Sequence, residues 1–223
     1  MTKTLITAAQ LAKFAPRCDA ARIAPTLDEA ARRFGIDTPR EIRHWMATLH
    51  HESGGFTRLA ENLNYSAKRL TEVWPSRFRT LAAAAPYANS PQKLANFVYG
   101  GRLGNTGPND GWLYRGSSWG QTTGKNNFRA ASADVGVDLV KNPDYLRTFE
   151  GAAVAAGSFW AKNGFNDIVA PDVGEALYAK IQDHLRFNEE DDLVQAREKY
   201  NGARKGLDDV RNQLVRAALI WGK

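Results

Sequence analysis

The sequence is poor in residues that bind metals. It has one cysteine, Cys18, among 223 residues, which excludes an internal disulfide and a cluster of thiolate ligands. The four histidines lack the spacing of zinc ligands, and His50 and His51 are adjacent, so they point in different directions on a helix. We therefore expect no metal site and no cofactor.

Long apolar runs are also missing. Residues 1–18 lack the apolar core of a secretory signal, and no run is long enough to span a membrane. We expect a protein that is made in a cytoplasm without a signal peptide and makes no stable membrane insertion. If it acts outside the cell, another factor must carry or release it.

Neither of the common phosphate-binding glycine motifs, GxxxxGK[ST] and GxGxxG, occurs in the chain. The net charge of +6 and the pI near 9.5 favour an anionic partner, such as a nucleic acid, an acidic polymer or an anionic envelope. A basic surface that is simply solvated gives the same charge. No nucleic-acid-binding motif accompanies it, so we expect no nucleic acid partner.

The pattern of caps and breaks predicts one mainly α domain over residues 1–223. Helix starts are indicated by Thr7 with Gln10, Thr26 with Glu29, Thr38 with Glu41, Asp172 with Glu175, Ser66, and Ser90 before Pro91. Residues 100–122 interrupt the pattern with seven glycines. There, an Asn-Asp-Gly step followed by Trp-Leu-Tyr predicts a turn and a short strand or β-hairpin near residues 110–122.

The helix that begins near Thr38 directs a carboxylate along its apolar side. That face is formed by Ile42, Trp45, Met46 and Leu49. Three residues further on is Glu52, just before Gly54 and Gly55 end the helix. Partial burial and the helix dipole both disfavour a negative charge there, which suits a general acid. A second acid, Glu61, follows nine residues later in a polar run.

Two carboxylates in different environments are what glycoside hydrolysis requires. One protonates the leaving oxygen, and the other acts on water or on the sugar. The alternative is that Glu52 is a solvated charge at a helix end and Glu61 a solvated loop residue. Spacing alone does not separate the two interpretations.

Other candidate residues have a structural alternative as well. Thr123 follows the glycine-rich loop and either caps the next helix or holds a water. Trp112 and Tyr114 either stack against sugars or anchor the loop in the core, where we expect Trp119. The last helix, with Arg204, Lys205, Arg211 and Arg216, could be a membrane-active amphipath, but we expect it to pack its apolar stripe.

Several segments occur in a recognisable order: His51–Phe56, Glu61–Ser66, Tyr114–Gly116 before Gln121–Gly124, Asn142–Asp144, Phe159–Trp160 through Asn163–Gly164, and Asn201–Gly202 before Gly206–Asp209. In combination they resemble family 19 glycoside hydrolases, from about residue 6 to the end. The short gap between the glutamates and the lack of cysteine pairs are more similar to the bacteriophage endolysin and bacterial lysozyme-type branch than to plant chitinases.

The resemblance implies an inverting hydrolase with a lysozyme-like, bilobal helical fold. Glu52 matches the family's general acid, Glu61 its general base, and Thr123 its water-holding residue. Positions that line the sugar cleft are matched by Gln121, Asn127 and Asn142, and also by Tyr65 and His51. The chain departs from the family's usual Arg-Gly-Arg-Gly at residues 115–120, which read Arg-Gly-Ser-Ser-Trp-Gly, and from its more glycine-rich pattern at residues 201–204.

We therefore expect a monomeric endolysin that cuts β-1,4 bonds of peptidoglycan and serves lysis of a bacterial host after its release from the cytoplasm. A chitinase acting on N-acetylglucosamine polymers or oligomers is the alternative within the family. A catalytically silent module that binds sugars or nucleic acid is the alternative from another class.

Overall fold

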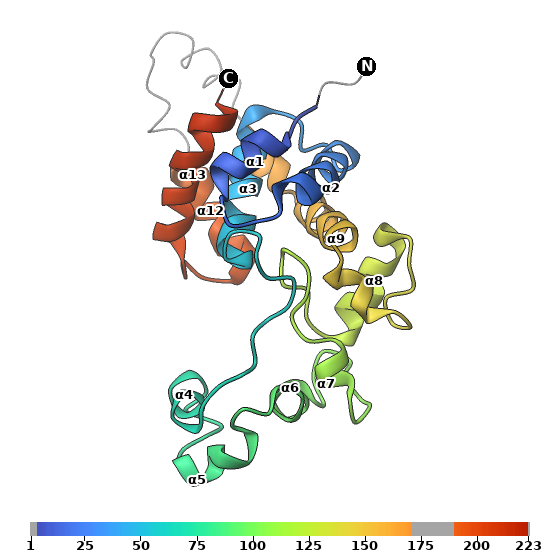
Figure 1. The fold of residues 1–223 in the computed structure, drawn as a ribbon, viewed down its shortest axis with the longest axis vertical. Coiled ribbons are helices and arrows are strands. Elements are labelled where there is room, and N and C mark those ends of the chain that lie inside the picture. Colours follow the sequence, from blue (N-terminus) through green and yellow to red (C-terminus); the bar gives the residue numbers. More distant parts are fainter. Residues whose placement is uncertain (1–3, 171–189, 223) are drawn as a thin grey trace. The chain divides into compact units, whose positions relative to one another are not determined.

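The computed structural model describes residues 4–170 and 190–222, and within them the chain is mainly α (Figure 1). The helix predicted from Asp172 and Glu175 lies outside the described residues. Contacts divide the chain into two compact units, one of Met1–Arg58 with Ala153–Lys223 and the other of Leu59–Ala152. Among the described residues, no helix is long and apolar enough to cross a membrane.

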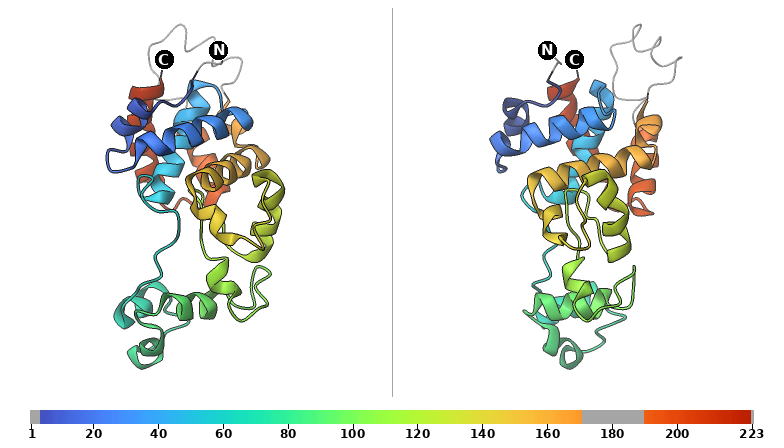
Figure 2. Two further views of the ribbon diagram at one scale, coloured as in Figure 1. Left: turned by 45° about the vertical axis from the view of Figure 1, so that its right-hand side comes forward. Right: turned by 90° about the vertical axis from the view of Figure 1, so that its right-hand side faces the viewer.

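Unit 1 contains α1 (Ala8–Phe14), α2 (Ala20–Arg33), α3 (Pro39–Ser53), α10 (Phe165–Val169), α12 (Glu190–Asn201), α13 (Leu207–Trp221) and most of α9 (Phe149–Lys162). Helix α3 lies at its centre and packs along α13 (Figure 2). Residues 41–49 of α3 are all buried, so this helix is enclosed and does not bury only the single apolar face that the spacing indicates.

The start of α3 follows the predicted capping box. The Thr38 hydroxyl accepts from Glu41 N at 3.2 Å, and Glu41 Oε2 accepts from Thr38 N at 2.9 Å. At the other end, Gly54 adopts a left-handed conformation with φ of 63°. These two ends fix where Glu52 falls in the last turn.

The predicted start of α2 was wrong. The helix begins at Ala20, because the Asp19 carboxylate caps it by accepting from Arg22 N at 3.3 Å. Thr26 lies inside the helix, next to Pro25, and its hydroxyl donates to Ile23 O at 2.8 Å. Asp19, which comes seven residues before Thr26, is therefore the N-cap residue that starts the helix.

Unit 2 contains α4 (Ala67–Val73), α5 (Leu81–Ala84), η1 (Ala85–Tyr87), α6 (Pro91–Tyr99), α7 (Asp110–Leu113), α8 (Lys125–Val135) and η2 (Pro143–Arg147). A core cluster joins its first helices through Leu63, Leu70, Phe78, Ala84, Leu94, Ala95 and Val98. The half-buried rings of Tyr65, Trp74 and Trp112 pack against this cluster.

In the region near residues 110–122, where a short strand or β-hairpin was predicted, Asp110–Leu113 form a helical turn instead of a strand. Tertiary contacts explain the difference. A Cβ on Gly111 would lie 2.5 Å from Ala95 O, so only glycine allows α7 this close to α6, where Trp112 N donates to Asn96 Oδ1 at 2.8 Å. Within the described residues, β pairing is confined to isolated bridges of Ser117 with Ala60 and with Thr122.

Replacing Thr38 with alanine removes the hydroxyl acceptor of the capping box, and we expect the free energy of unfolding to fall by about 1 kcal/mol. Urea unfolding measures the change. Thr106→Ala, at an exposed threonine outside any helix, is the matched control and should leave the midpoint unchanged. Equal stability of both variants would contradict the assigned role of the cap.

Candidate active site

The first predicted catalytic carboxylate, Glu52, is half-buried in the last turn of α3. Its Oε1 is 2.7 Å from Nη1 of Arg197 on α12, and the side chains of Glu52 and Arg197 are only 18% and 4% exposed. The partial burial of Glu52 agrees with the helical spacing. Its arginine partner, 145 residues away in the chain, was not predicted.

Arg197 is oriented by the loop that precedes α13. Its Nε donates to Lys205 O at 2.7 Å, and Asn201 Nδ2 donates to the same oxygen at 2.9 Å. Gly206 has φ of 76°, and a Cβ there would lie 2.4 Å from His51 Nε2. The Asn201–Gly202 and Gly206 motif therefore has a physical role, which is to hold the arginine that contacts Glu52.

His51 is tied to α13. Its Nδ1 lies 2.6 Å from Asp209 Oδ2. Burial raises the pKa of Asp209, but hydrogen bonds from His51 and Gln213 outweigh it, so the pKa is below its usual value. An ionised Asp209 requires that His51 Nδ1 carry the proton. The role of His51 in binding sugar stays a prediction.

The second predicted carboxylate, Glu61, belongs to unit 2, where both of its oxygens accept hydrogen bonds. The Tyr99 hydroxyl donates to Oε2 at 2.7 Å, and Gly116 N donates to Oε1 at 2.7 Å. In return, Glu61 N donates to Gly116 O at 2.9 Å. Glu61, which the sequence left open as a solvated loop residue, is thus held by hydrogen bonds to its carboxylate and to its backbone.

Tyr99 is held as a donor. Burial raises its pKa first, and the charge of Glu61 and the hydrogen bond to it raise it further, so the phenol keeps its proton. Arg115 is also close to this carboxylate. Burial and the charge of Arg147 lower the pKa of Arg115 to about 10, against the opposing charges of Asp144 and Glu61, so the guanidinium stays charged at neutral pH.

Gln121 is close to Glu61 across Gly116. A Cβ on Gly116 would lie 2.7 Å from Gln121 Oε1 and 3.3 Å from Glu61 Oε1. Gly116 therefore leaves space that both side chains use. The sequence identified Gln121 as a site residue, but it gave no signal for this role of the glycine.

The interpretation of Thr123 as a helix cap was wrong, because α8 (Lys125–Val135) has Gly124 as its N-cap residue without a side-chain bond. The Thr123 hydroxyl donates to Gln121 O at 3.1 Å, and Asn127 Nδ2 donates to Thr123 O at 2.7 Å. These three predicted residues thus form one network. The Thr123 oxygen keeps its acceptor lone pairs, which a water could use.

The predicted stacking residues differ from one another. Tyr114 is 3% exposed, its hydroxyl donates to Val140 O at 2.9 Å, and its ring packs on Phe128, so the prediction of a sugar platform there is corrected to a core residue. Trp112 is half-buried, with the Arg115 guanidinium 3.7 Å from its ring centroid. Trp119 is fully buried, as expected.

The remaining predicted residues are exposed or half-buried. Tyr65 makes an edge contact with Trp74 at 5.5 Å between ring centroids. Asn142 is exposed just before η2, where its backbone N–H donates to Asp138 O. Among the described residues, no group of three or more His, Cys, Asp or Glu side chains could hold a metal ion.

Comparison with known proteins gives a sequence relative and similar folds. Over 97 residues, 43% of this chain and 48% of the relative, the chain is 41% identical to a glycosyl hydrolase family 19 domain-containing protein of Haemophilus influenzae. The chain thus spans about half the length of this curated relative. No family model matches the chain.

Chitinase C from Streptomyces griseus HUT6037 has a similar fold, with a TM-score of 0.59 at 15% identity over 100% of this chain and 95% of that one. A bacterial family 19 chitinase gives a TM-score of 0.55 at 16% identity, over 98% of this chain and 95% of that one. These likenesses confirm the mainly α, lysozyme-like fold. Over 97 residues the chain is thus similar in sequence to a family 19 glycoside hydrolase domain protein, and its fold is similar to that of bacterial chitinases.

Proposed function

We propose that this protein hydrolyses β-1,4 bonds of bacterial peptidoglycan by an inverting mechanism, with Glu52 as general acid and Glu61 as general base. The observation that carries the proposal is the difference between the two carboxylates. One is paired with a buried cation, and the other accepts from a phenol and from a backbone amide. Inverting hydrolysis needs two carboxyl groups with different tasks.

The contact with Arg197 supports a specific arrangement of the acid. Because Arg197 binds Oε1 of Glu52, the proton that a general acid delivers belongs on Oε2. The guanidinium then stabilises the carboxylate left behind after proton transfer to the leaving oxygen. Its anchoring to Lys205 O keeps the pair in one orientation during this step.

The contacts of Glu61 suit a base that takes a proton from water. Donors on both oxygens fix the plane of the carboxylate, so its remaining lone pairs have defined directions. Thr123 and Gln121, joined through the Gln121 carbonyl, are proposed to orient that water. Asn127 holds the Thr123 backbone in place.

The net charge supports the choice of polymer. A chain with a net charge of +6 is attracted to an anionic bacterial envelope, whereas chitin is uncharged. We propose that the protein serves host lysis as a monomer that reaches the wall after release from the cytoplasm. Chitin is the second candidate, because both of the similar solved structures are named chitinases.

Glu52→Gln should lower the rate of wall lysis by at least about a hundredfold, because an amide cannot supply the proton. The loss of turbidity of purified walls measures the rate. The midpoint of thermal unfolding tests whether the protein stays stably folded when Arg197 has lost its charge partner. Glu198→Gln is the matched control, because it alters an exposed carboxylate of α12 that pairs with Arg204 in the following loop. Lysis near the wild-type rate in a folded Glu52→Gln protein would remove Glu52 from the mechanism.

Tyr99→Phe removes one donor from Glu61 and should reduce kcat by about tenfold to a hundredfold, because a hydrogen bond to a charged group is lost. Tyr114→Phe is the control, because it deletes a buried hydroxyl of the same unit that donates to the Val140 carbonyl. We expect this control to lose stability but keep kcat. Equal kcat values for the two variants would show that the Tyr99 contact is only structural.

The substrate is tested by parallel assays on purified peptidoglycan and on soluble chitin oligomers. Mass spectrometry of the products identifies the bond that is cut, and anomeric analysis of early products shows whether configuration inverts. Faster cleavage of chitin would favour the second candidate. Binding to walls without release of reducing ends would instead indicate a sugar-binding module.

A further inference from the structure

The charge of the protein is concentrated in one part of unit 2, the α4–α6 segment (residues 62–109). Between Glu61 and Asp110, six basic residues accompany a single acid, so the segment carries five of the chain's six net positive charges. The basic residues are Lys68, Arg69, Arg77, Arg79, Lys93 and Arg102. The one acid, Glu72, is engaged by Arg69 at 2.8 Å. The remaining cations therefore have no acid within the segment to neutralise them.

Two of these cations lie over aromatic rings. The Arg77 guanidinium is 6.0 Å from the centroid of Phe97, and Lys93 Nζ is 5.4 Å from that of Tyr87. The two rings are themselves 4.5 Å apart. Lys93 and Phe97 are four residues apart on α6, so they share one face of the helix. Arg77 and Lys93 thus flank a pair of contacting aromatic rings.

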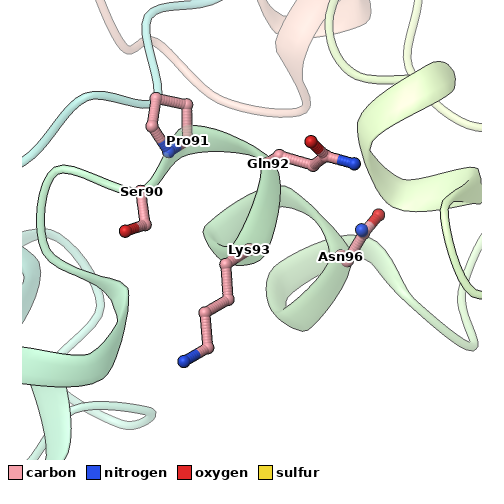
Figure 3. A pocket seen from close by; sticks show the side chains of 5 residues that line it. All are labelled: Ser90, Pro91, Gln92, Lys93 and Asn96. Atoms are coloured by element: carbon pink, nitrogen blue, oxygen red, sulfur yellow. The ribbon is translucent and has the colours of Figure 1, made fainter.

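The side-chain amides of α6, Gln92 and Asn96, point in a different direction from Lys93 (Figure 3). Figure 3 shows the Lys93 side chain pointing away from those of Gln92 and Asn96, although all three line one open pocket of about 460 Å³ together with Ser90 and Pro91. Both amides donate to Asn109 Oδ1, Gln92 at 3.4 Å and Asn96 at 3.2 Å. They are engaged within the protein, so the Lys93 face offers charge and apolar surface without a row of amides.

Apolar side chains are exposed beside the cations. Leu81 is 58% exposed and Phe97 is 39% exposed. Leu81 opens α5 directly after Arg79 and Thr80, and it is followed by a run of exposed small apolar residues: Ala82, Ala83, Ala85 and Pro86. An exposed apolar patch on a folded protein marks an interaction site when polar groups surround it.

We propose that the α4–α6 segment is a docking surface for an anionic phospholipid bilayer. Leu81 and Phe97 enter the boundary between headgroups and acyl chains, and Arg77, Arg79 and Lys93 contact lipid phosphates. The exposed apolar groups favour lipid over a wall polymer or a nucleic acid, which needs no apolar insertion. Tyr87 and Phe97 pack against each other, so their faces are not free for base stacking. Binding of this kind is peripheral and reversible.

Sedimentation of the full chain with vesicles tests the proposal. We expect binding to vesicles that contain phosphatidylglycerol, little binding to phosphatidylcholine alone, and weaker binding as salt is added. Lys93→Gln should weaken binding about fivefold, and Arg77→Gln, Arg79→Gln and Lys93→Gln together about a hundredfold. Leu81→Ser should also weaken it, because the apolar contact is lost while the charge is unchanged.

Matched controls are available in the same chain. Lys141→Gln removes a cation of unit 2 outside the segment, and Leu219→Ser removes a leucine of α13 that is 86% exposed. Both should bind like the wild type. Circular dichroism and urea unfolding establish that each variant is folded. Arg77→Gln could disturb the packing of Phe97, whereas Leu81→Ser alters no packed ring and therefore tests the surface independently.

Some results would overturn the proposal. Equal binding to neutral and anionic vesicles would show that the basic residues do not contribute to binding. Loss of binding by Leu219→Ser but not by Leu81→Ser would show that the protein docks through α13 and not through the α4–α6 segment. Wild-type binding to purified walls or to DNA, with none to anionic vesicles, would identify a polymer as the ligand of the surface instead.

Discussion

The ion pair between half-buried Glu52 and buried Arg197 holds three parts of unit 1 together. A guanidinium that is 4% exposed has lost its water, and its partners here are Glu52 and the Lys205 carbonyl. Removing one partner from such a buried pair costs about 3–5 kcal/mol, because the other charge is left uncompensated. The end of α3, the middle of α12 and the loop before α13 are therefore joined through one side chain.

The second carboxylate is stabilised in a different way. Glu61 accepts hydrogen bonds from neutral donors, one from a phenol and one from a backbone amide. Two glutamates of identical chemistry are thereby placed in distinct surroundings, one beside a full charge and one beside neutral dipoles, as the proposed acid and base roles require.

The sequence predicted those parts of the site that depend on local structure. Helical spacing and the capping box located Glu52, and the motif around Gln121 and Thr123 identified residues that do form one network. Arg197 could not be found in this way, because its partner is 145 residues distant. The helical turn at Asp110–Leu113 was missed for a related reason, since the close approach of Gly111 to α6 overrides the local turn signal.

The core of the α4–α6 segment has a kinetic consequence. Its seven buried residues all lie between Leu63 and Val98, so closing these contacts requires only short loops and costs little chain entropy. Low contact order favours rapid formation, whereas the packing of α3 on α13 joins opposite ends of the sequence. We expect a folding order in which this local cluster forms early and the side chain of Arg197 reaches Glu52 late, so that the proposed acid acquires its environment only after α12 and the loop before α13 have been made.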